Sequence, residues 1–169
     1  PAVQDSTLSL PRSSGRSQLF VHIATDEGIE GLGIGALSPG VQEIIESSFK
    51  ELLIDQDPFD IERLWNDMYW RLRSYGNKGI GFSALSAVDV GLWDLKAKAV
   101  GLPLYKLLGA YTDSVPIYGS GGWTNLSEED LLSEMSEYVE SGIPRVKMKV
   151  AKNFGMSERE DLARVAAVR

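Results

Sequence analysis

The sequence contains no cysteine and only one histidine, His22. The lack of cysteine excludes disulfides, thiolate zinc sites and a cysteine nucleophile within this chain. A Ser-His-Asp triad would have to use His22, which lies in the strand-like run 19–25, where a structural histidine is the simpler interpretation. If the chain binds a metal, we expect oxygen ligands and Mg²⁺.

Long hydrophobic runs are lacking too. No apolar stretch approaches the roughly 18 residues that a transmembrane helix needs, so no membrane span is expected. The first residues do not form a basic and then apolar leader, so no signal peptide is predicted and the cytoplasm is the expected compartment. The sequence does not begin with methionine, and we expect its natural N-terminus to be missing.

A surplus of positive charge is also absent. Acidic residues number 24 against 17 basic ones, which gives a net charge of -7 and a pI of about 4.8. Because nucleic-acid binding depends on neutralising phosphates, a nucleic-acid partner is not expected. The 169 residues are 43% hydrophobic and 24% charged, as in ordinary globular proteins, and suffice for one domain and part of another.

The first two thirds of the chain predict an α+β domain. Residues 16–25 and 29–36 have the pattern of two strands, and Asp26-Glu-Gly28 supplies the turn of a hairpin. Asp57-Pro58 resembles an N-cap followed by proline at the first helical position. Helices are expected over about 39–53, from Asp57 to about Tyr75, over about 82–100 and over about 103–108.

The pattern changes near residues 111–113. A short strand at 115–118 is followed by a loop at 119–123, a helix over 127–141 and a strand at 146–150. Ser127 lies three residues before Asp130, and Ser157 and Glu160 have the spacing of a capping box before a last helix. Strand, helix, strand, helix is typical of a parallel sheet or barrel. We therefore predict two domains, residues 1–112 and 113–169.

Two weaker patterns are assigned structural roles. Gly31-Leu-Gly33-Ile-Gly35-Ala36 matches a dinucleotide-binding fingerprint, but it lies inside a hairpin arm instead of opening a helix. Its glycines are better explained by strand packing that leaves no room for side chains. Asp89 and Asp94 are five residues apart and share a helical face poorly, so capping or packing is favoured over acid/base catalysis.

The most informative pattern is Val146-Lys-Met-Lys-Val150. Side chains alternate across a strand, so Lys147 and Lys149 share one face and the apolar residues the other. Two ammonium groups at close range disfavour each other's protonated form, which can make one lysine a base near neutral pH. Spacing alone favours the alternative, a solvated strand face that carries two lysines.

The segment Ser86–Gly109, SAVDVGLWDLKAKAVGLPLYKLLG, resembles the enolase superfamily, in particular its mandelate racemase and muconate-lactonizing branch. The hairpin at 16–36 is similar to the opening strands of that family's capping domain. This resemblance implies an α+β capping domain followed by a (β/α)₈ barrel, with the Lys-x-Lys pair on the second barrel strand. The lysines would then point into the barrel interior, toward the mouth where active sites of this fold lie.

The resemblance also implies roles for individual residues. Lys149 would remove the proton α to a substrate carboxylate, and Lys147 would help to hold that carboxylate and favour the basic form of Lys149. Mg²⁺ would stabilise the resulting enediolate, as enolase-type sites do in general. The loop with Ser120 and Trp123 would lie at the same mouth, and Arg16 could reach an acidic substrate group, although an ordinary strand-start arginine is an equal alternative.

In the family, the metal is bound by carboxylates on the third, fourth and fifth barrel strands. The sequence reaches only the second barrel helix, so no metal ligand is assigned in it and the chain is expected to be incomplete at both ends. As given, it should not bind the metal properly or turn over substrate.

For the whole protein we expect a Mg²⁺-dependent lyase or isomerase acting on a small-molecule carboxylate, with no nucleic-acid or membrane partner and with homo-oligomeric assembly by resemblance. Acid-sugar dehydration is the first expectation, with racemisation or epimerisation next. The alternatives are a cycloisomerase or dipeptide epimerase of the same superfamily, and a non-catalytic interaction domain that reuses the cap.

Overall fold

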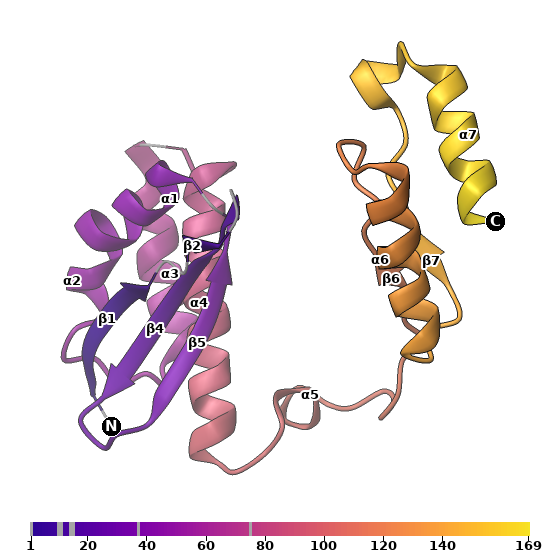
Figure 1. Ribbon diagram of the computed structural model, residues 1–169. Helices are drawn as coiled ribbons and strands as arrows, with labels where there is room; N and C mark the ends of the chain where they lie inside the picture. The colour runs from indigo at the N-terminus through magenta and orange to yellow at the C-terminus, as the bar shows by residue number, and fades with distance from the viewer. Residues whose placement is uncertain (1, 10–11, 14–15, 37, 75) are drawn as a thin grey trace. The chain divides into compact units, whose positions relative to one another are not determined.

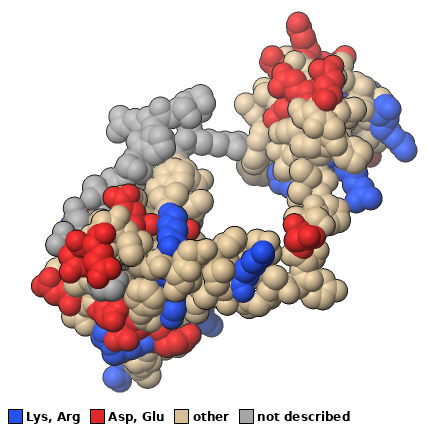
Figure 2. All heavy atoms as spheres, turned by 90° about the horizontal axis from the view of Figure 1, so that it is seen from below, with Lys and Arg blue, Asp and Glu red and all other residues tan. Residues whose placement is uncertain are grey.

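The computed structural model describes residues 2–9, 12–13, 16–36, 38–74 and 76–169. The chain forms two compact units, Pro1–Tyr111 and Thr112–Arg169 (Figure 1). On the face drawn in Figure 2, acidic and basic side chains are interspersed over the first unit. Within the described ranges, no helix is long and apolar enough to cross a membrane.

The first unit contains a three-stranded antiparallel sheet in the order β1-β4-β5. Val21 of the central strand pairs with Gly33 of the edge strand, and the turn at 26–28 closes through a bond from the Gly28 N–H to the Thr25 carbonyl. Gly28 has φ +74, a conformation that glycine adopts without strain. The predicted hairpin is confirmed, and β1 is a third strand that pairs antiparallel with β4. The strands are β1 (Val3–Ser9), β4 (Leu19–Thr25) and β5 (Glu30–Gly35), with a small hairpin of β2 (Arg12–Ser13) and β3 (Arg16–Ser17).

The predicted helices are present, with differences at their ends. The segment predicted at 39–53 is helical throughout but contains a π-helical turn, η1, which its sequence pattern did not indicate. The long helix α4 ends where predicted, just before Gly101, whose φ is +68. The helices are α1 (Pro39–Ile44), η1 (Ile45–Phe49), α2 (Lys50–Leu53), α3 (Ile61–Arg71), η2 (Leu72–Ser74), α4 (Ile80–Ala99) and α5 (Leu104–Leu107).

The helix α4 packs directly on the glycines of β5. A Cβ built at Gly31 would lie 2.1 Å from the carbonyl oxygen of Gly91, and one built at Gly33 would lie 1.9 Å from that of Ala87. The interpretation of these glycines as packing positions is confirmed, because helix and strand backbones meet with no space for a side chain. The remaining core comes from β4, the helices and Val3 of β1, with residues such as Val21, Ile23, Phe49, Leu64, Met68, Leu85, Leu92 and Leu95 fully buried.

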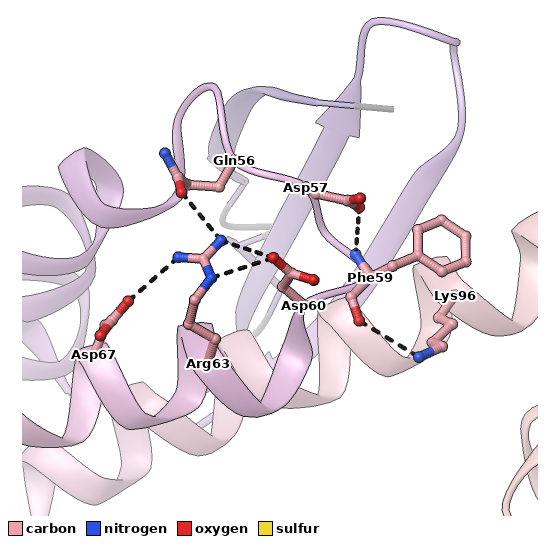
Figure 3. A network of polar contacts seen from close by, with 7 residues as sticks. All are labelled: Gln56, Asp57, Phe59, Asp60, Arg63, Asp67 and Lys96. Carbon is pink, nitrogen blue, oxygen red and sulfur yellow. Dashed lines mark hydrogen bonds and ion pairs between the residues drawn. The ribbon is translucent and has the colours of Figure 1, made fainter.

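Helix α3 begins later than its sequence predicted. Asp57 is not its N-cap: the Asp57 carboxylate accepts the N–H of Phe59 at 2.9 Å and so closes a turn. Arg63 then ties this turn to the helix through Asp60, Gln56 and Asp67, at N···O distances of 3.1 to 3.4 Å (Figure 3). The start of α3 was predicted too early because an aspartate side chain can accept a nearby main-chain N–H both in a turn and at a helix N-cap. The sequence pattern alone does not distinguish the two.

The second unit has the predicted strand-helix-strand-helix order. The strands β6 (Gly119–Ser120) and β7 (Val146–Lys147) are parallel, with Ser120 opposite Lys147. The expected strand at 115–118 is wrong, since the paired residues come directly after it. The other elements are α6 (Glu128–Glu140), η3 (Lys152–Gly155) and α7 (Glu158–Val168).

The two predicted caps of this unit have different outcomes. The Ser127 hydroxyl accepts the N–H of Asp130 at 3.0 Å, which confirms it as the N-cap of α6. Ser157 makes no cap bond to α7; its hydroxyl instead accepts the side-chain amide of Asn153 at 2.8 Å. Glu160, the expected capping-box partner, pairs with Lys152 at 2.5 Å.

Candidate active site

Lys147 and Lys149 lie on the strand that borders the glycine-rich segment after β6. The N–H of Gly121 donates to the Lys147 carbonyl, and the N–H of Lys149 donates to the Gly122 carbonyl, both at 3.0 Å. Parallel pairing therefore continues beyond the two residues of β7 itself. These bonds fix the backbone of both lysines against residues 119–122.

Each lysine side chain lies over an aromatic ring from this neighbouring segment. The Lys147 ammonium is 5.0 Å from the centroid of the Tyr118 ring and 3.4 Å from its hydroxyl. The Lys149 ammonium is 5.5 Å from the centroid of the Trp123 ring. Such contacts attract an ammonium group to the ring face. Both side chains are exposed to solvent in this chain.

The alternate residues of the strand face other parts of the unit. Val146 lines a groove with Met135 and Val139 of α6 and with the end of α7. Met148 lies close to Gly122, where a built Cβ would come within 2.5 Å of the Met148 Cβ. Val146 and Met148 thus pack within the unit while the lysines extend toward Tyr118 and Trp123, as the predicted alternation requires. Val150, the third apolar residue of the predicted face, is instead 54% exposed.

The other predicted site residues are placed differently. Ser120 is a residue of β6 and not of a loop, and its carbonyl accepts the Tyr138 hydroxyl at 3.3 Å. Trp123 lies beside Lys149, as described above. Arg16 belongs to β3 in the first unit, where it pairs with Ser13; its side chain lies outside the described part of the structure, so its proposed contact with substrate stays a prediction.

Two charged residues that the sequence analysis did not select contact the same segment from the helices. The Glu134 carboxylate of α6 accepts the N–H of Gly122 at 2.7 Å. Arg164 of α7 donates to the carbonyls of Trp123 and Leu126, both at 2.9 Å. The glycines of the run Gly119-Ser-Gly-Gly122 are the sequence feature that could have indicated the Glu134 contact. A Cβ at Gly121 would lie 2.4 Å from the Glu134 carboxylate, so this close approach requires glycine.

The described residues do not form a metal site of their own. Nowhere in them do three or more histidine, cysteine, aspartate or glutamate side chains gather in a way that could hold an ion. His22 pairs with Glu30 on the hairpin at 2.9 Å. Asp94 accepts the N–H of Leu32 at 2.8 Å and pairs with Lys98 at 2.7 Å, which is a packing role.

Comparison with known proteins gives the family. The family model for the N-terminal domain of mandelate racemase and muconate lactonizing enzyme matches residues 5–109. The chain therefore belongs to this family, a branch of the enolase superfamily. The predicted fold class is confirmed: an α+β capping domain followed by the start of a barrel.

Its relatives are enzymes that act on sugar acids or related compounds. The chain is 35% identical over 155 residues to a 3,6-anhydro-alpha-L-galactonate cycloisomerase of Streptomyces coelicolor, covering 89% of this chain and 42% of that protein. It is 36% identical over 155 residues to the L-talarate/galactarate dehydratase of Salmonella typhimurium, covering 89% and 38%.

A solved racemase structure from Streptomyces coelicolor, with bound magnesium, matches with a TM-score of 0.83 and 32% identity over 98% of this chain and 50% of that one. The chain thus spans half the length of these relatives or less.

Proposed function

We propose that this chain is the N-terminal part of an enzyme that removes the proton α to a carboxylate, with Lys149 as the base. The observation that carries the proposal is the pair of lysines on one strand face. The backbone of this strand is hydrogen-bonded to residues 119–122. The family and the enzymatic character of the relatives support it. Lys147, which lies two residues before the base and on the same strand face, would bind the substrate carboxylate.

We propose an acid sugar as substrate and dehydration as the reaction, with racemisation or epimerisation as the next candidate. The dehydratase relatives support the first choice. Cycloisomerases among the relatives support a further alternative, in which the group that leaves is part of a ring. The substituent on the carbon next to the enediolate separates these outcomes, since a free hydroxyl permits dehydration and a ring oxygen permits ring opening or closure.

Mg²⁺ is proposed as cofactor because solved relatives contain it. The residues that the structure describes do not fit a magnesium site by themselves, so we propose that the ligands lie in other parts of the barrel. The domain limits 1–112 and 113–169 are retained as a proposal, supported by the family match to 5–109 and by the division after Tyr111. Homo-oligomeric assembly and a cytoplasmic location remain predictions.

The test is exchange of the substrate α-proton with deuterated water, catalysed by the longer protein that contains this chain. Lys149→Met should lower the exchange rate by at least about 100-fold, since a positioned general base contributes about 10²–10⁴. Lys147→Met should chiefly raise the KM of the carboxylate substrate. Lys152→Met is the matched control, because that ammonium is directed to Glu160 and should leave exchange unchanged.

Parental exchange rates in the Lys149→Met protein would overturn the assignment of the base. If exchange is absent from the parent protein with every sugar acid tried and binding to a protein partner survives both substitutions, the interaction-domain alternative would take its place.

A further inference from the structure

Arg164 is a buried cation that, within the described residues, hydrogen-bonds to main-chain carbonyls alone. Its side chain is only 6% exposed in the middle of α7. Nη1 donates to Leu126 and Nη2 to Trp123, both at 2.9 Å, and Nη2 also approaches the Gly122 carbonyl at 3.5 Å. The three acceptors belong to the single segment that leads from β6 to α6. Arg164 of α7 therefore binds the loop of residues 122–126 through its main chain.

Stability alone is a weak reason for an arginine at this position. Removing a guanidinium from water is costly, and an apolar side chain of similar length often replaces a buried charge without loss of stability. Within the described residues Arg164 has no carboxylate partner, and its buried Nε has no hydrogen-bond partner. What arginine offers here is geometry, because its planar fork reaches several diverging carbonyls at once.

The loop that Arg164 holds is the one that contacts Lys149. The Gly122 carbonyl accepts the Lys149 N–H at 3.0 Å, and the Trp123 ring lies under the Lys149 ammonium. On its other side the Gly122 N–H is bound by Glu134. The backbone that orients Lys149 is thus fixed by two charged side chains, one from each helix of the unit.

We propose that Arg164 is a positioning residue: by fixing residues 122–126 it sets where the Lys149 ammonium and the Trp123 ring lie at the mouth of the barrel. The proposal rests on the proposed function of Lys149. Arg164 does not contact substrate in this role. Without it the carbonyls of Gly122, Trp123 and Leu126 lose the guanidinium donors, although the first two keep main-chain bonds from Lys149 and Leu126. The loop then gains freedom, and Lys149 is presented to the substrate in a less defined position.

The experiment compares Arg164→Lys and Arg164→Met with Arg159→Met in the longer protein that contains this chain. Arg159 is an exposed arginine of the same helix and serves as the control. We expect both Arg164 variants to lower kcat for α-proton exchange by about 10- to 100-fold, the loss typical of small displacements of a catalytic group. The KM should change little, and Arg164→Lys, which keeps the charge but not the fork, should recover part of the loss.

Amide hydrogen exchange supplies a readout that does not depend on activity. In both Arg164 variants, exchange at residues 122–126 and at the Lys149 amide should become faster, while Arg159→Met leaves it unchanged. Parental kcat in a folded Arg164 variant, or unchanged amide exchange in the loop, overturns the proposal. So does failure of both variants to fold, since the residue would then be purely structural.

Lys149→Met, measured in parallel, separates the two proposals. Retained exchange in that variant removes the proposed function, whereas its loss together with parental kcat in the Arg164 variants removes only the role of Arg164.

Discussion

At the scale of single residues, the site shows what spacing can predict and what it cannot. Alternation along 146–150 correctly predicts that Val146 packs toward the helices while the lysines face elsewhere. It says nothing of Tyr118 and Trp123 as their ring partners, because these contacts depend on the register between two strands. The role of Arg164 was not predicted for a similar reason. The residue lies about 40 positions from its acceptors in the sequence, and no local pattern in α7 indicates a buried arginine.

Asp89 provides a prediction about pH. Its burial raises the pKa of the Asp89 carboxyl above the ordinary 3.8, the Glu62 carboxylate raises it further, and a hydrogen bond from Trp93 acts in the opposite direction. The folded protein then keeps a proton at pH values where the unfolded chain has lost it. The free energy of unfolding should therefore fall as pH rises from 3.8 through the folded-state pKa. We expect Asp89→Asn to remove this loss and to stabilise the protein at neutral pH.

The measurement is urea unfolding of the parent and Asp89→Asn proteins at a series of pH values, followed by tryptophan fluorescence. Glu46→Gln, which removes an exposed carboxylate of η1, is the control and should leave the Asp89-dependent slope in place. A lower free energy of unfolding for Asp89→Asn at neutral pH would contradict the assignment, and would mean that the ionised carboxylate is stabilising.

At the scale of elements, the sequence predicted the helices well, but it placed the start of α3 too early and misjudged the bond made by Ser157. Helical spacing of apolar residues located α3, α4 and α6, because one buried face imposes that period. Asp57 and Ser157 were wrong as caps because each side chain bonds elsewhere, the first to Phe59 and the second to Asn153. An aspartate or serine in the sequence shows that its side chain can accept a hydrogen bond from a helix N–H. It does not show whether another group nearby is bonded instead.

Strands were harder to place than helices. The apolar run 115–118 was expected to be the strand, yet pairing begins at Gly119, where the parallel partner strand lies. Only that partner determines which residues are bonded, and it comes 27 positions later, at Val146. The β5 glycines were correctly read as packing positions, since three glycines at alternate positions all face one side of a strand.

Gly33 allows the packing of β5 on α4 to be tested. Gly33→Ala would place a Cβ 1.9 Å from the Ala87 carbonyl oxygen, and neither backbone can move without disturbing the sheet or the helix. We expect a loss of at least about 1–3 kcal/mol in the free energy of unfolding, as for other overpacked positions. Gly40→Ala is the control, because a Cβ there meets mainly the end of the flexible Ile80 side chain at 3.0 Å.

Urea unfolding monitored by circular dichroism measures both variants. Equal stability of Gly33→Ala and the parent would show that helix and strand are not in the close contact described.

At the scale of the whole molecule, the two units differ in how much apolar surface they bury. Val21, Phe49, Leu64 and Leu92 are examples of the extensive core of the first unit. In the second unit, the described apolar side chains that are buried are Leu131, at 0% exposure, and Met135, at 4%. The β6–β7 sheet has only two strands, and such sheets are marginal unless further strands or helices cover them. The first unit has the core of an independent domain, whereas the second has the character of part of a larger barrel.

This difference predicts unequal protection from amide hydrogen exchange in the 169-residue chain. Burial of one large apolar side chain contributes roughly 1.5–3 kcal/mol, so the small core of the second unit should open far more readily than that of the first. Amides of α6 and α7 should exchange at least about 10-fold faster than those of α4, which corresponds to about 1.4 kcal/mol of opening free energy.

In a longer protein that supplies the other barrel strands, protection of α6 and α7 should rise while that of α4 stays the same, because only the second unit gains neighbours in the barrel. Equal protection of all three helices in the 169-residue chain would contradict this account. It would mean that two βα units hold Lys147 and Lys149 in place without the rest of a barrel.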